Sequence, residues 1–168
     1  HYDATFRFVG AVCDVVLNAA SSDFLELEDY TRVNRRDVSQ KMTVREKLEL
    51  AVGFILEDLG GKNGLICLPD SMDICPEMEE YVLNHGNTGK LGSNSANYWD
   101  NYCYGHYSAY ENILFYQMLN KLYELEMLCG NTPKAEEYAA LAKTVRQNYD
   151  KYFWDEEKGR YINVVDSE

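Results

Sequence analysis

The sequence has few basic residues for its size and lacks a long apolar run. Lys and Arg number 16 against 28 Asp and Glu, so the formal net charge is -12 at pH 7. Nucleic acids and anionic membrane surfaces are bound through basic patches, so this balance argues against both as partners. No apolar stretch reaches the ~18 residues that a membrane-spanning helix needs. A neutral partner such as a glycan is compatible with the charge, although the charge does not single one out.

Metal-site and disulfide spacings are also missing. The cysteines form no C-x-x-C pair, and their number is odd: Cys13, Cys67, Cys75, Cys103 and Cys129. We therefore expect mostly buried reduced thiols, no metal and no cofactor. The sequence begins at His1 without Met and shows no signal peptide, which leads us to expect a fragment of a longer protein.

Tyrosine is unusually abundant, with 14 residues. Its flat apolar ring and its hydroxyl suit the face of a sugar, but they suit a helical core with hydrated edges equally well. Where the tyrosines gather along the chain is therefore more informative than their number.

The N-terminal part of the chain predicts strands. Residues 4–30 carry short runs of Val, Phe and Leu around a turn-like break at 18–23, and apolar and acidic residues alternate after it. This alternation is typical of a hairpin with one hydrated face. The polar, basic stretch 31–42 is interpreted as a connector.

Three helices are predicted in the remainder. The first spans about 43–59, with Thr43 and Glu46 as a capping box and glycines at its end. The others, about 107–129 and 132–153, form an αα-hairpin in which Thr132 caps the second helix. Residues 155–159 predict a turn and 160–165 a short strand. A stretch with little periodicity, 62–106, lies between, and such long loops are often functional.

The end of that long stretch places one carboxylate, Asp100, among five aromatic side chains directly before an apolar helix. A general acid for glycosidic cleavage must keep its proton near neutral pH. Apolar surroundings raise a carboxyl pKa because they disfavour the charged form. The alternative is that Asp100 caps a turn or the next helix and that the aromatic rings belong to a core.

Four pieces of the chain resemble the six-hairpin glycosidases, a superfamily that includes trehalases, amylo-1,6-glucosidases and rhamnosidases. Residues 64–70, with Gly-Leu-Ile and Leu-Pro-Asp, are similar to the loop that leaves an inner helix, and residues 98–101 are similar to an aromatic-Asp loop. Residues 110–116 are similar to the start of an inner helix, and residues 139–161 to an outer helix and its exit. The resemblance covers about residues 43–165.

This resemblance implies that Asp100 is the general acid. The candidate substrate-binding residues are the aromatic and polar side chains of these loops and of the helix start: Asp70, Tyr98, Trp99, Asn101, Tyr104, His106 and Glu111. Three of them have structural alternatives: Asp70 as a residue that holds its loop, His106 as a hydrogen-bonded loop residue, and Glu111 as an acidic residue favoured by the helix dipole. Inverting enzymes place a second carboxylate roughly 6.5–9.5 Å from the first. The resemblance puts that base on a later hairpin, after Glu168. We therefore expect the isolated chain to be inactive, with Glu111 as a local candidate for a catalytic role.

The prediction is thus a mainly α fold: part of an (α/α)6 toroid over 43–168, after a β-rich segment with a short β-hairpin over 1–42. The expected partners are a carbohydrate substrate and either the rest of the catalytic domain or a second copy, contacted through helix faces that expose Leu114, Phe115 and Met118. The alternative function is a non-catalytic, repeat-like helical-hairpin module for interaction or sugar binding. No ~34-residue repeat recurs to support this alternative.

Overall fold

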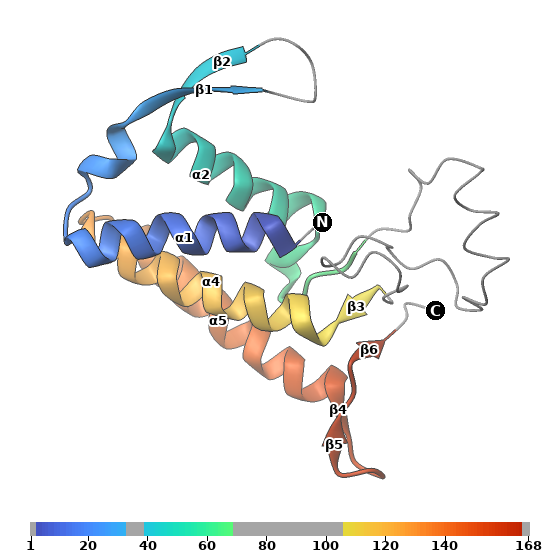
Figure 1. Ribbon diagram of the computed structural model, residues 1–168. Helices are drawn as coiled ribbons and strands as arrows, with labels where there is room; N and C mark the ends of the chain where they lie inside the picture. The colour runs from blue at the N-terminus through green and yellow to red at the C-terminus, as the bar shows by residue number, and fades with distance from the viewer. Residues whose placement is uncertain (1–2, 33–38, 69–105, 166–168) are drawn as a thin grey trace, which may run out of the picture.

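The computed structural model describes residues 3–32, 39–68 and 106–165 (Figure 1). Helices dominate these parts of the chain: α1 (Asp3–Ala19), α2 (Val44–Gly53), α4 (Ala109–Leu128) and α5 (Thr132–Phe153). The fold is therefore mainly α, as the sequence predicts. None of the described helices is long and apolar enough to cross a membrane.

Short elements connect the helices. In the described ranges these include two 3-10 turns, η1 (Asp23–Glu26) and η3 (Gly61–Asn63), and the π-helical turn η2 (Phe54–Asp58), which continues α2. Three antiparallel two-stranded sheets pair β1 (Glu28–Arg32) with β2 (Ser39–Thr43), β3 (Tyr107–Ser108) with β6 (Val164–Val165), and β4 (Trp154–Asp155) with β5 (Arg160–Tyr161). The predicted turn over 155–159 is confirmed, whereas the predicted strand over 160–165 is divided into β5 and β6, which belong to different sheets.

The prediction of strands at the N-terminus is wrong, because residues 3–19 form α1. Its buried apolar side chains follow a helical period: Phe6, Val9, Val12, Cys13 and Val16. A short Val-rich run is compatible with a strand or with a buried helix. Packing of the segment against other helices decides which of the two forms. The β-hairpin lies instead at β1 and β2, where Glu28 faces Thr43, partly within the stretch interpreted as a connector. The domain boundary after residue 42 stays a prediction.

The predicted capping box at the start of α2 is confirmed. The Glu46 N–H donates to the Thr43 hydroxyl over 3.1 Å, and the Thr43 N–H donates to the Glu46 carboxylate over 2.7 Å. These bonds satisfy two backbone donors that the first turn of a helix leaves unpaired. The helical stretch ends at Gly60, whose φ of +70° lies in the left-handed region that glycine tolerates.

The αα-hairpin of α4 and α5 is also confirmed, with one difference at its turn. Gly130 has a φ of +76°, which reverses the chain directly after α4. The N-cap residue of α5 is Asn131, whereas the sequence predicts Thr132, and the Asn131 side chain makes no capping hydrogen bond. The Asn131 amide instead donates to Glu126 over 3.3 Å, so it closes the turn against α4.

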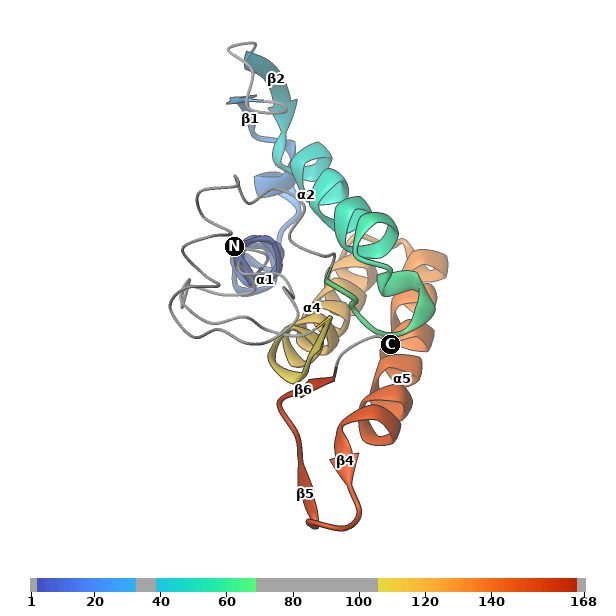
Figure 2. The ribbon, with the colours of Figure 1, turned by 90° about the vertical axis from the view of Figure 1, so that its right-hand side faces the viewer.

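Helices α1 and α4 lie side by side and run in the same direction (Figure 1). Arg7 contacts Tyr110 near their first turns, and Lys121 contacts Asp14 over 2.6 Å further along both. Helices α2 and α5 run the opposite way on the other side of α4, as the view in Figure 2 shows. The described helices thus form two layers, and the two helices of each layer run in the same direction.

One core joins all four helices. Its buried side chains come from α1, α2, α4 and α5, and Phe6 of α1 packs edge-on against Phe115 of α4 with ring centroids 6.4 Å apart. Phe115 and Met118 are buried, at 0% and 2% exposure, and Leu114 is half-buried. The expectation that Phe115 and Met118 lie on an exposed face is therefore wrong, because α1 covers them. Self-association stays a prediction.

Candidate functional site

The start of α4 is fixed by strand pairing with the C-terminal part of the chain. Ser108 stands opposite Val164 in the β3–β6 pair, and the Ala109 N–H donates to the Asn163 carbonyl over 2.9 Å. The first turn of α4 therefore has a defined direction, and the residues on it are held in place by backbone bonds.

The loop after η3 approaches the helices closely because of a glycine. Gly64 has a φ of +89°, and a Cβ there would lie 2.7 Å from side-chain atoms of Thr144 and Asn148 on α5. The Asn148 amide donates to the Gly64 carbonyl over 3.3 Å. Another side chain at this position would push the loop away from α5.

Asn112 on α4 connects this loop to the helix. Its amide oxygen accepts from the Ile66 N–H over 2.7 Å, and its amide nitrogen donates to the carbonyls of Ile66 over 3.2 Å and Ser108 over 2.9 Å. The side chain is fully buried. Two of the pieces that carry the resemblance, 64–70 and 110–116, are thus brought together by one amide.

We expect Asn112→Ala to lower the free energy of unfolding by about 2–3 kcal/mol, because each buried backbone group left unpaired costs roughly 1–3 kcal/mol. Urea unfolding followed by circular dichroism measures this. The matched control is Asn120→Ala on the same helix: its amide also donates to the carbonyl four residues earlier, over 2.7 Å, but it is exposed. The control should change stability by less than about 0.5 kcal/mol. Equal losses in both variants would contradict this role of Asn112.

The long segment 69–105 leaves and re-enters the described fold at one place, beside the first turn of α4. The Leu68 N–H donates to the His106 carbonyl over 2.7 Å. Both residues are buried. The residues on either side of this segment are therefore bonded to each other, next to Asn112.

Glu111 is the most unusual side chain at this end of α4. It is 0% exposed, and neither of its carboxyl oxygens has a hydrogen-bond partner among the described residues. Burial raises its pKa, and the negative charge of Asp3 adds to this effect. The Ser108 hydroxyl acts in the opposite direction without making a hydrogen bond to the carboxyl. The arrangement favours a neutral carboxyl group, which can donate a hydrogen bond as well as accept one.

This burial predicts a pH-dependent cost. The neutral form of Glu111 is favoured by folding, so stability is fully present below the unfolded pKa, near 4.5, and is lost as pH rises through the higher folded pKa. In Glu111→Gln we expect that loss to disappear. Its melting temperature minus that of wild type should grow from pH 4 to pH 8. Glu124→Gln, at an exposed position of α4, is the control and should show a constant difference. A constant difference for Glu111→Gln as well would refute the buried neutral carboxyl.

Three polar residues at the first turns of α1 and α4 were missed by the sequence analysis. Asp3, only 5% exposed, accepts from Arg7 Nε over 3.1 Å, and the Arg7 guanidinium donates to the Tyr110 hydroxyl. Asp3 and Arg7 were overlooked because this region was assigned to strands, where residues four apart do not share a face as they do on a helix. The helical spacing of Phe6, Val9 and Cys13 was the signal that could have found them.

The predicted site residues divide into two groups. His106 and Glu111 lie in the described fold, at the start of α4, and both are buried. The others lie outside the described residues: Asp70, Tyr98, Trp99, Asp100, Asn101 and Tyr104. Within the described ranges no group of three or more His, Cys, Asp or Glu side chains is arranged to hold a metal ion.

Comparison with known proteins gives one result. The sequence profile of the trehalase family matches residues 80–164, half of the chain, from within the long segment to β6. The match marks a glycoside hydrolase domain, which implies a carbohydrate substrate. The chain belongs to the trehalase family. No curated protein and no solved structure matches it.

Proposed function

We propose that this chain is part of the catalytic domain of a glycoside hydrolase that cleaves a glycosidic bond by acid/base catalysis, with Asp100 as the general acid. The observation that carries the proposal is the match of the trehalase family over 80–164, which includes Asp100. The bond between Leu68 and His106 supports it, because it brings both ends of the segment with Asp100 to the first turn of α4, the turn that carries Glu111.

The helices support a toroid in the following way. In an (α/α)6 ring, inner helices run parallel to one another and each is followed by an antiparallel outer helix. We propose that α1 and α4 are inner helices and that α2 and α5 are outer ones, since α1 and α4 are parallel neighbours. This assignment makes α2 an outer helix. The resemblance of the loop that follows it, residues 64–70, implied an inner helix instead. The repeat-like module has no comparable support.

In the proposed chemistry, Asp100 gives its proton to the leaving oxygen. Trp99, with Tyr98 and Tyr104, supplies ring faces for stacking on the sugar. The hydroxyl groups of the sugar bond to polar side chains around it: Asp70, Asn101 and His106. Glu111 is 0% exposed, so it does not bond to the sugar directly. Its neutral form is also unsuited to the role of a base, because a base must be ionised before it takes a proton. The second carboxylate that glycoside hydrolysis requires is not assigned to a residue of this chain.

The test of the function is turnover by the full-length protein that carries these residues. It is assayed against aryl glycosides and natural disaccharides, with trehalose among them. We expect hydrolysis of at least one glycoside, with release of the reducing sugar. Absence of turnover on every member of the panel by a folded protein would overturn the proposal.

A further inference from the structure

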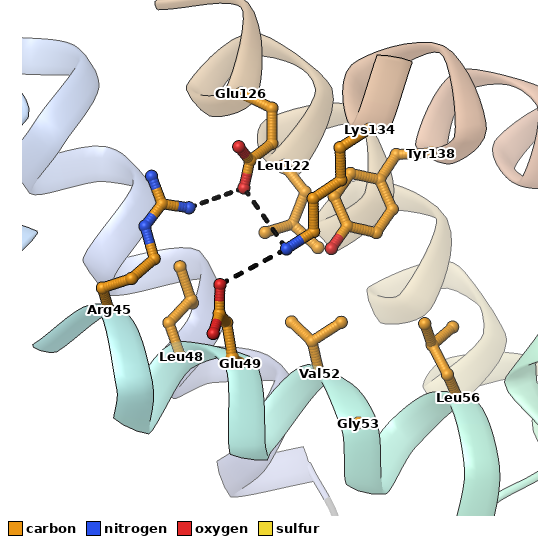
Figure 3. A pocket seen from close by; sticks show the side chains of 10 residues that line it. All are labelled: Arg45, Leu48, Glu49, Val52, Gly53, Leu56, Leu122, Glu126, Lys134 and Tyr138. Atoms are coloured by element: carbon orange, nitrogen blue, oxygen red, sulfur yellow. Dashed lines mark hydrogen bonds and ion pairs between the residues drawn. The ribbon is translucent and has the colours of Figure 1, made fainter. Parts of the chain in front are cut away.

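A groove of about 370 Å³ lies between α2 and α5 (Figure 3). Leu122 and Glu126 of α4 line it together with residues from both of those helices. Leu48, Val52 and Leu122 form its packed floor, since they are at most 5% exposed, while Gly53 and Leu56 are half-buried and present the apolar surface that a ligand can reach. The groove is therefore a narrow apolar slot with α4 beneath it.

Two cations and two carboxylates stand together at one end of the slot. Arg45 Nη1 lies 2.6 Å from Glu126 Oε1, and this pair is largely buried. Lys134 Nζ is held less closely, at 3.4 Å from Glu49 and 4.0 Å from Glu126 (Figure 3). The group is electrically balanced. It still offers hydrogen-bonding capacity, because an ammonium group has three N–H donors and Glu49 is half-exposed.

Tyr138 supplies a polar atom inside the slot. Its side chain is only 6% exposed, and its hydroxyl points across the groove towards α2 (Figure 3). The described residues offer this hydroxyl no hydrogen-bond partner. Burial and the nearby charge of Glu126 raise its pKa, so it stays protonated and available to donate. The hydroxyl oxygen itself is not fully enclosed, so a ligand in the groove can reach it and accept its hydrogen bond.

The opposite wall has an opening at Gly53. This residue lines the groove, and a Cβ built there would meet nothing within 4 Å. Its φ of −56° is ordinary helical geometry, which any residue adopts. Glycine is thus not required here by the backbone, although it weakens a helix by about 1 kcal/mol relative to alanine.

We propose that this groove is a second carbohydrate-binding site that takes a neutral, polyhydroxylated ring. The apolar walls accept the C–H face of such a ring, while Tyr138, Lys134 and Glu49 provide both donors and acceptors for its hydroxyls. A charged ligand fits poorly. An anion would meet two carboxylates on a chain whose net charge is -12, and a cation would meet Arg45 and Lys134.

The site is separate from the proposed catalytic end. Leu122 lies eleven residues after Glu111 on α4, which is roughly 16 Å along the helix at 1.5 Å per residue. The inference does not depend on Asp100. Binding in the groove and loss of turnover in Asp100 variants are measured separately, so either can fail without the other.

The experiment is methyl-resolved NMR titration of the full-length protein with trehalose and methyl α-glucoside. Glucuronate provides an anionic ring for comparison, and cyclohexanol an apolar ring with one hydroxyl. We expect millimolar binding of the two neutral sugars, with saturable shifts of the Leu48, Val52 and Leu122 methyl groups. Gly53→Phe fills the open space without backbone strain and should abolish these shifts. Tyr138→Phe should weaken binding roughly 2- to 10-fold, the range expected for one hydrogen bond.

The control variant is Leu50→Phe, an aromatic substitution on the same helix at a position that is 57% exposed and outside the groove. It should leave the titration unchanged. Three results would overturn the proposal: no shift of the groove methyl groups with either neutral sugar, tighter binding of glucuronate or cyclohexanol, or full binding in a folded Gly53→Phe protein. Since Gly53 sits in open space, that variant is expected to fold, and its melting curve verifies this.

Discussion

Asp100→Asn in the full-length protein is expected to lower kcat by roughly 10²- to 10⁴-fold, the usual contribution of a general acid. Asparagine keeps the size of the side chain but has no proton to give to the leaving oxygen. The Michaelis constant should change little, because the rings that stack on the sugar are untouched. The loss should be smallest for aryl glycosides with acidic leaving groups, since these need little protonation to depart. Steady-state kinetics with a series of such substrates measures it.

The control for this variant is Asp23→Asn, an exposed carboxylate after α1 and away from the start of α4. It should leave kcat unchanged. Wild-type turnover in Asp100→Asn would remove Asp100 from the reaction. A loss of equal size for every leaving group would point to a structural role instead.

Arg45→Met is expected to destabilise the protein by about 3–5 kcal/mol, the cost of breaking a buried ion pair. Glu126 is 2% exposed, and Arg45 is its closest cation at 2.6 Å. Without the guanidinium, the partners that remain within the described ranges are Asn131 at 3.3 Å and Lys134 at 4.0 Å, beside a carboxylate that has lost its hydration. Chemical unfolding at pH 7 measures the difference.

The double variant Arg45→Met, Glu126→Leu tests the cause. With both charges gone, stability should return to within about 1 kcal/mol of wild type, because buried pairs are often replaced by apolar residues at little cost. Lys62→Met is the exposed counterpart, since Lys62 and Glu57 are both more than half-exposed, and it should cost less than about 1 kcal/mol. A double variant as unstable as the single one would show that packing, not charge, is lost.

Local patterns predicted the three helices after residue 42 well. The capping box at Thr43, the stop at Gly60 and the hairpin at Gly130 depend on neighbouring residues, so they can be read along the chain. Helix α1 could not be predicted in this way, because its Val-rich runs are compatible with a strand as well as with a helix. The packing of α1 against α4 makes it a helix, and Phe6 and Phe115 are 109 residues apart.

The candidate site was predicted only in part, for a similar reason. Glu111 was named as a substrate-binding residue because of its place in a family-like helix. Its burial follows from contacts distant in sequence. Asn112 holds the loop at Ile66 over the first turn of α4, and α1 brings the charge of Asp3 towards Glu111. Arg7 was missed altogether, although it donates to Tyr110 in the same first turn.

Two similar four-residue patterns show what the local sequence determined and what the tertiary structure determined. Thr43 to Glu46 and Ser108 to Glu111 both have the hydroxyl-x-x-Glu sequence of a capping box. The sequence by itself determined that a helix begins at each, and both helices do begin there. Glu46 is accessible and closes its box, whereas Glu111 is enclosed and makes no capping bond. The tertiary structure alone decided this difference, because what surrounds a helix end depends on segments that the local sequence does not specify.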